Sequence, residues 1–165
     1  MYLESHPQTS VTVDIAASPQ TLWPLISDIG TPALFSDELR EAEWSTAGSP
    51  NGVGATFVGR NSSSRGYTWE TRPTISCCDE PRLFEWRVGD VETPLATWSF
   101  EVTATPRGAT LTHRVIFGTG VSPLRDAVER DPEHAEQVVT GRLVELHASM
   151  TKVVEGIKVL AEASS

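Results

Sequence analysis

The chain has 165 residues, of which 39% are hydrophobic and 21% charged, and its formal net charge is -9. Length and composition are those of one ordinary globular domain, so we expect a single domain over residues 1–165. The negative charge argues against nucleic acid and anionic lipid as partners, because phosphate binding is driven by basic side chains.

No apolar run approaches the ~20 residues that a membrane helix needs, so no integral membrane segment is predicted. The N-terminal stretch MYLESHPQTS lacks the basic and apolar regions of a secretion signal, which predicts a cytoplasmic protein. The two cysteines, Cys77 and Cys78, are adjacent and on a strand would point to opposite faces. We interpret them as packing residues rather than a redox or metal pair, and predict no metal and no cofactor.

Residues 11–16 alternate apolar and polar side chains and predict a first strand. The next stretch, SPQTLWPLISDI, begins like a helix, since Ser18 can cap it and Pro19 suits its first position. Pro24 removes a backbone donor further in, so we expect a kinked or broken helix near residues 20–24. A second short helical segment is predicted around Phe35, in PALFSDEL.

From about residue 41 to 118 the pattern is that of strands separated by turns, including AGSPNGVG at residues 47–54. The six predicted strands are residues 40–45, 55–61, 66–78, 82–88, 94–104 and 109–117. In series they form an antiparallel meander.

The C-terminal part returns to helical spacing. Residues 122–130 predict a short helix, either a lid or a rigidly packed element. Beyond Asp131 and Pro132, apolar residues recur every three and four positions and predict a helix of roughly 30 residues, about 45 Å long. Its apolar stripe must bury against the sheet. We therefore predict an α+β fold: a seven-stranded antiparallel sheet wrapped around a long C-terminal helix, with two short helices after the first strand.

This order of elements resembles the helix-grip fold of the START-like, or SRPBCC, superfamily. The phrases VDIAASPQTLWPLISDI, ALFSDELREAEW, ATWSFEV and MTKVVEGIKVLAE look like those of its polyketide cyclase/dehydrase branch. The resemblance implies a cavity between sheet and helix that binds an apolar or aromatic small molecule. It is specific for fold and weak for chemistry, since many members of the superfamily have no known catalytic role.

Strand alternation indicates which side chains would face that cavity. Trp98 and Phe100 share one face of their strand, and Trp86 and Trp69 point inward by the same test. These rings either fill the core or line a ligand site. The predicted ligand-binding residues are Phe35, Phe57, Tyr67, Trp69, Trp86, Trp98, Phe100, His113, His147 and Met150.

His113 holds an inward position where the pattern expects an aliphatic residue. It is the candidate catalytic residue, and the alternative is a structural histidine satisfied by a hydrogen bond. On the long helix, His147 and Arg142 lie on opposite margins of the apolar stripe, where they either reach the cavity rim or face solvent.

In the aromatase/cyclases that the sequence resembles, the strand corresponding to GYTWETRPTI carries a tryptophan and a cavity arginine. Trp69 matches, but alternation places Arg72 on the opposite face unless a bulge at Pro73 turns it inward. Cyclase activity is therefore left open beside two alternatives: a non-catalytic carrier of a lipid or hydrophobic metabolite, and a protein-interaction module. The expected partner is a hydrophobic small molecule, and the expected state is monomer or homodimer.

Overall fold

The computed structural model describes residues 1–45 and 52–164. The elements in chain order are η1 (Tyr2–Ser5), β1 (Gln8–Ile15), α1 (Pro19–Ile26), η2 (Thr31–Leu34), β2 (Leu39–Trp44), β3 (Phe57–Ser62), β4 (Thr68–Thr71), β5 (Pro73–Asp79), β6 (Leu83–Gly89), β7 (Pro94–Thr105), β8 (Gly108–Phe117), α2 (Pro123–Arg130), η3 (Pro132–His134) and α3 (Ala135–Ala163). The α+β class, the antiparallel pairing, the two short helices after the first strand and the long C-terminal helix are confirmed. The predicted turn at residues 47–54 lies mostly outside the described residues.

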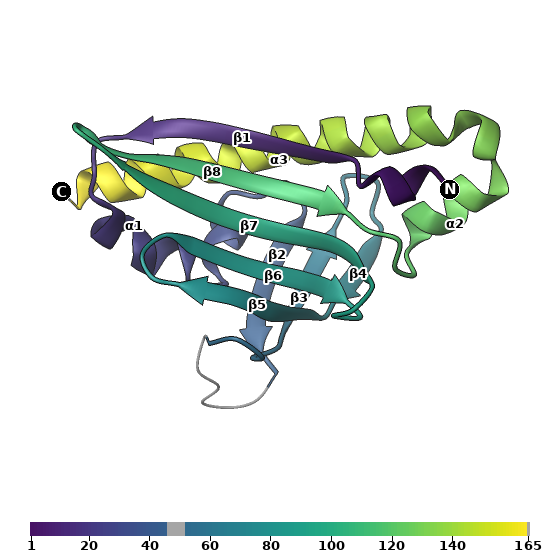
Figure 1. Cartoon of the computed structure of the whole chain (residues 1–165), viewed down its shortest axis with the longest axis horizontal. Coiled ribbons are helices and arrows are strands. Elements are labelled where there is room, and N and C mark those ends of the chain that lie inside the picture. Colours follow the sequence, from purple (N-terminus) through teal and green to yellow (C-terminus); the bar gives the residue numbers. More distant parts are fainter. Residues whose placement is uncertain (46–51, 165) are drawn as a thin grey trace.

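The strands form two sheets, so the prediction of one seven-stranded sheet is wrong. A five-stranded sheet has the order β1-β8-β7-β6-β5, and a three-stranded sheet has the order β2-β3-β4. The smaller sheet crosses behind the larger one in Figure 1. The predicted strand over residues 66–78 is divided: Thr71 pairs with Gly59 of β3, whereas Pro73 pairs with Val88 of β6. Pro73 has no N–H to continue the first ladder, and the chain changes sheets beside it.

Helix α1 begins as predicted, with the Ser18 hydroxyl accepting a hydrogen bond from the Thr21 backbone N–H at 3.1 Å. It continues through Pro24 and ends at Ile26, so a broken helix is wrong, whereas a kink near residues 20–24 stays a prediction. Pro24 lies exposed on the outer side, and the carbonyl that loses its donor belongs to Gln20 in the first turn. Leu22 and Ile26 are buried on the opposite side.

Helix α3 spans 29 residues and runs along the sheet beside β1 (Figure 1). Its C-terminal half joins a buried cluster with α1 and the inner faces of β6, β7 and β8. Its N-terminal half joins a second cluster with η1, α2 and the far ends of β7 and β8. In the described part of the chain, no helix is long and apolar enough to cross a membrane.

Candidate functional site

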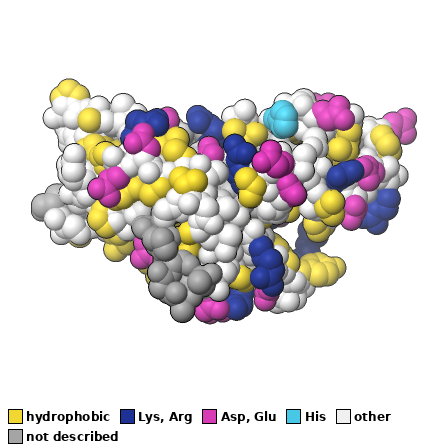
Figure 2. Space-filling view, turned by 60° about the horizontal axis from the view of Figure 1, so that its bottom comes forward, with side chains coloured by type: hydrophobic (Ala, Val, Ile, Leu, Met, Phe, Trp, Pro, Cys, Tyr) yellow, Lys and Arg dark blue, Asp and Glu magenta, His cyan; other side chains and the backbone are white. Residues whose placement is uncertain are grey.

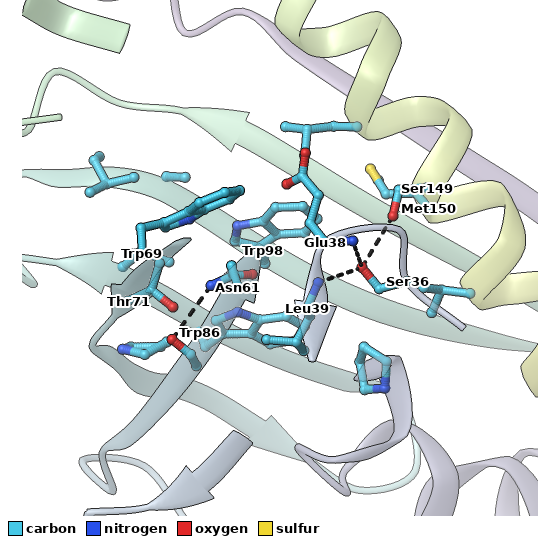
Figure 3. Close-up of a pocket in the computed structure, with 18 of the residues that line it drawn as sticks. Ser36, Glu38, Leu39, Asn61, Trp69, Thr71, Trp86, Trp98, Ser149 and Met150 are labelled. Atoms are coloured by element: carbon cyan, nitrogen blue, oxygen red, sulfur yellow. Dashed lines mark hydrogen bonds between the residues drawn. The ribbon is translucent and has the colours of Figure 1, made fainter. Parts of the chain in front are cut away.

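A cavity of about 640 Å³ lies between the two sheets and the N-terminal half of α3. Its walls come from the segment after α1, from β2 to β8, from the start of α2 and from α3. Figure 3 shows side chains from these elements pointing into the same space. A helix laid across a curved sheet covers only part of its inner face, and the remaining space stays open here.

Three tryptophans form flat apolar walls around this space. Trp86 of β6 and Trp98 of β7 are cross-strand partners, and their rings are nearly parallel, at 3° with centroids 6.3 Å apart. Trp69 comes from the smaller sheet and lines the same cavity (Figure 3). All three are only partly buried, so each has ring surface left for a further contact.

His113 lies at the buried side of this aromatic group. Its ring stacks on Phe100, with centroids 4.0 Å apart and an angle of 10°. Nδ1 lies 2.9 Å from the Ser99 carbonyl oxygen, and because a carbonyl can only accept, Nδ1 carries the proton. Burial lowers the pKa of His113 from 6.5 to about 4, and the hydrogen bond to Ser99 opposes this only in part. The imidazole is therefore neutral at pH 7, and its Nε2 is a hydrogen-bond acceptor.

An ion pair stands on the cavity wall between β2 and α3. The Arg142 guanidinium donates two hydrogen bonds to the Glu38 carboxylate, one of them 2.8 Å long between Nη2 and Oε1. These bonds raise the pKa of Arg142, against the opposing effect of burial. The pair is mostly shielded from solvent, with the Glu38 side chain 17% exposed.

The segment carrying Glu38 is also tied to α3 by a neighbouring serine pair (Figure 3). The hydroxyls of Ser36 and Ser149 lie 3.2 Å apart, and the Asp37 N–H donates to Ser149 Oγ at 3.0 Å. Further out, Lys152 Nζ lies 2.6 Å from Asp37 Oδ1. We call residues 36–38 the rim segment.

Eight of the ten predicted ligand-binding residues line the cavity. They are Phe57, Tyr67, Trp69, Trp86, Trp98, Phe100, His113 and Met150. That they contact a ligand stays a prediction.

The other two predicted residues, Phe35 and His147, lie elsewhere. The Phe35 ring rests on Gly156 of α3, so close that an added Cβ there would come within 2.4 Å of it. His147 is exposed and pairs with Thr9 Oγ1 at 3.0 Å, on the side of α3 that faces β1. Both placements depend on how α3 is rotated against its neighbours.

The arginine expected from the cyclase resemblance does not reach the cavity. The Arg72 side chain is 73% exposed and pairs with Glu70. The break between β4 and β5 thus leaves Arg72 outward rather than turning it in.

Several polar cavity residues escaped the sequence analysis, chiefly Glu38, Asn61 and Ser149. For Ser149 a signal existed, since it stands in the apolar stripe of α3 between Leu146 and Val153. Glu38 lies in a connection and Asn61 on a short strand, and in neither place is the apolar repeat long enough to make a polar residue stand out.

No metal site is evident over residues 1–45 and 52–164, where no three His, Cys, Asp or Glu side chains are arranged to hold an ion. Cys78 packs against the core, and burial raises the pKa of its thiol. On the face shown in Figure 2, acidic and basic side chains are interspersed with hydrophobic ones, and no single sign dominates.

Comparison with known proteins agrees with this architecture. The family described as polyketide cyclase / dehydrase and lipid transport matches residues 6–155. A polyketide-cyclase-like protein from Corynebacterium glutamicum is 25% identical, with a TM-score of 0.63 over 93% of this chain and 90% of that one. No curated protein sequence matches the chain.

Two solved structures with lower identity share the fold. One is a di-domain ARO/CYC protein of the steffimycin biosynthetic pathway, at 13% identity and a TM-score of 0.71, covering 95% of this chain and 51% of that one. The other is a major latex-like protein from Panax ginseng, at 13% identity and a TM-score of 0.62, covering 94% of this chain and 97% of that one. With the family match over most of its length, this chain belongs to the polyketide cyclase/dehydrase and lipid transport family.

Proposed function

We propose that the protein binds a flat hydrophobic small molecule, of aromatic or polyketide type, in the cavity between sheet and α3. The observation that carries the proposal is the set of three partly buried indole rings, Trp69, Trp86 and Trp98, on the walls of one cavity. Core-filling tryptophans would be enclosed by other side chains, whereas these keep free ring surface toward an open space. Stacking on such rings favours planar apolar ligands.

The size of the space supports the same proposal. A volume of about 640 Å³ lies inside the range of roughly 300–1,000 Å³ that is usual for small-molecule sites. Largely apolar walls with a few polar groups at defined places are also typical of such sites, since the polar groups orient a ligand that the walls hold.

We rank binding ahead of catalysis because of His113. A general base works best when its pKa lies near the working pH, and a neutral imidazole whose pKa is about 4 has little affinity for a further proton at pH 7. His113 is better suited to accept a hydrogen bond from a ligand O–H than to remove a proton. Cyclase-like chemistry is the second candidate, favoured by the presence of this Nε2 at the cavity.

Binding can be tested with 1-aminoanthracene, a flat neutral fluorophore, titrated into the purified protein. We expect saturable binding that Trp69→Leu weakens at least roughly fivefold, because stacking surface worth about 1 kcal/mol is removed. Trp44→Leu is the matched control, since Trp44 packs edge-on behind the cavity residue Phe57 and does not itself line the cavity. Absence of saturable binding, or equal losses in both variants, would contradict the proposal.

The two candidates separate when a poly-ketone is incubated with the protein and recovered for mass spectrometry. Recovery of unchanged compound supports binding alone. A dehydrated product that forms with the wild type and not with His113→Gln would move catalysis ahead.

A further inference from the structure

The serine pair on the rim segment has a hydrogen-bond direction that can be derived by counting donors and acceptors. A serine hydroxyl has one proton and two lone pairs. Ser36 Oγ accepts from the backbone N–H groups of Glu38 and Leu39, both at 3.0 Å. Because both lone pairs are then used, we assign the Ser36 hydroxyl as the donor to Ser149 Oγ, 3.2 Å away.

The same count at Ser149 leaves one proton over. Its oxygen accepts from the Ser36 hydroxyl and from the Asp37 N–H at 3.0 Å, which fills both lone pairs. Within residues 1–45 and 52–164, the partners of Ser149 Oγ are Ser36 and Asp37, so this count finds no acceptor for the Ser149 proton. Thr151 and Ser164 of the same helix, by contrast, donate to the carbonyl one turn earlier. Ser149 is only 6% exposed, and it lines the cavity.

A buried hydroxyl donor without an acceptor is costly, by roughly 1–3 kcal/mol for a polar group left unsatisfied. The surrounding network holds the Ser149 oxygen in place and orients its proton, so the donor is fixed before any ligand arrives. From this we propose that Ser149 is a ligand-binding residue whose hydroxyl donates to a carbonyl oxygen of the bound molecule. The inference rests on the proposed function, because it assigns an orienting group within the same cavity.

The charges on the cavity wall narrow the ligand class further. Four charged residues line the cavity: Asp28, Glu38, Glu70 and Arg142. The single cation, Arg142, already donates to Glu38 and also lies 3.5 Å from Glu145. Glu70 is ion-paired with Arg60 and Arg72, and Asp28 accepts a hydrogen bond from the Gly30 N–H. An anionic ligand would therefore meet three carboxylates and no free cation on the described wall. The cavity fits a neutral ketone better than a carboxylate.

Three naphthalenes of similar shape, titrated into the whole chain, test the hydrogen bond from Ser149 and the preference for a neutral ligand. They are 2-acetylnaphthalene, which carries a carbonyl; 2-ethylnaphthalene, which lacks any polar atom; and 2-naphthoate, which carries a carboxylate. Each is titrated by calorimetry or by displacement of 1-aminoanthracene, against the wild type, Ser149→Ala and Lys152→Met.

We expect the affinity ratio of the acetyl to the ethyl compound to fall about five- to tenfold in Ser149→Ala, as for loss of one hydrogen bond. The ratio cancels any loss of affinity that Ser149→Ala causes equally for both compounds, such as a loss from less dense packing around the cavity. Lys152→Met breaks the outer contact of the rim segment with Asp37 but keeps the Ser149 hydroxyl, so its ratio should match the wild type. Naphthoate should bind at least tenfold more weakly than the ketone.

Failure of the proposed function, of the role of Ser149 and of the neutral ligand class would each give a different result. If neither neutral compound binds the wild type saturably, the proposed function falls, and the role of Ser149 with it. If both bind and the ratio is the same in Ser149→Ala, only the role of Ser149 is overturned. Tighter binding of naphthoate would show that Arg142 is the polar anchor and overturn the neutral ligand class.

A second measurement covers the case in which Ser149→Ala does not fold. The infrared carbonyl band of 2-acetylnaphthalene bound to the wild type should lie below its position in hexane, because a hydrogen bond weakens the C=O bond. Ser149→Thr keeps the hydroxyl and should keep the shift. A bound carbonyl band at the hexane position would overturn the proposal.

Discussion

The two halves of helix α3 occupy different environments. In the C-terminal half, Val154 and Ile157 are fully buried among α1 and strand side chains, and Phe35 closes on Gly156. In the N-terminal half, Leu146, Ser149 and Met150 border the cavity. We call these the packed half and the cavity half. The difference shows how one helix serves stability and binding together: dense packing around Val154 and Ile157 holds the helix, while space stays open beside Leu146, Ser149 and Met150.

The largest expected contrast comes from truncating one buried side chain in each half. Ile157→Ala should lower the free energy of unfolding by about 3–4 kcal/mol, because a new void opens inside dense packing. Met150→Ala should cost roughly 2 kcal/mol or less, since the deleted atoms border space that already exists. Urea denaturation of both variants measures the two values. Equal losses would break the distinction between the halves.

Acid should lower the free energy of unfolding because His113 is buried in its neutral form. Its folded pKa of about 4 lies below the ordinary 6.5, so the unfolded chain binds a proton that the folded chain does not. Stability is therefore fully present above pH 6.5 and is lost as the pH falls toward 4, by about 3 kcal/mol in all.

Unfolding measured between pH 7 and 4.5 checks this, with His113→Gln as the comparison. The lowered pKa of Glu162 acts only below its ordinary value of 4.5, outside that window. A wild-type curve as flat as that of the variant would show that His113 is not held neutral.

Two glycines of α3, one in each half, test the same difference in packing. Gly156→Ala should destabilise the protein by roughly 1–3 kcal/mol, because the new Cβ collides with the Phe35 ring. Gly141→Ala, near the start of the helix, meets nothing within 4 Å and should stabilise by about 0.5–1 kcal/mol through helix propensity. Thermal or urea unfolding measures both. A stabilising Gly156→Ala would mean that Phe35 does not seal the packed half.

The smallest effects concern the ionic contacts of the rim segment in the cavity half. A double-mutant cycle on Glu38 and Arg142 should give a coupling of about 1–2 kcal/mol, because the pair is shielded and doubly hydrogen-bonded. The same cycle on Asp37 and Lys152, both about half exposed, should give less than about 0.5 kcal/mol. A larger coupling energy for Asp37 and Lys152 than for Glu38 and Arg142 would show that the rim segment is held to α3 mainly by its exposed contact.

Much of the larger sheet could be predicted because strand alternation is a local property. The inward positions of Trp98, Phe100 and His113 follow from counting residues along β7 and β8, and the structure places all three on the cavity side. The division at Arg72 was harder, although Pro73 inside a long strand pattern was a warning. Which sheet each piece joins depends on partners far away in the chain.

The parts of the site contributed by helices and connections were less predictable. Local spacing gives no sign that Phe35, which follows η2, meets Gly156 of α3. A helical wheel likewise cannot tell whether His147 turns toward the cavity or toward β1. The pairing of Glu38 with Arg142 joins residues 104 positions apart. No local pattern connects them, because each looks like an ordinary charged residue at the edge of its own element.

The sequence by itself determined the order of elements, the inward faces of the long strands and the apolar stripe of α3, since each arises from a repeat that neighbouring residues carry. The tertiary structure alone decided that the strands divide into two sheets, that Phe35 seals one end of α3, and that space remains beside Trp69, Trp86 and Trp98. It also decided that Ser149 meets Ser36 and the Asp37 N–H at the cavity wall, which is the arrangement from which we infer that its proton has no acceptor. A void and an unpaired donor are both defined by what distant segments fail to fill, and only the folded arrangement of those segments determines that.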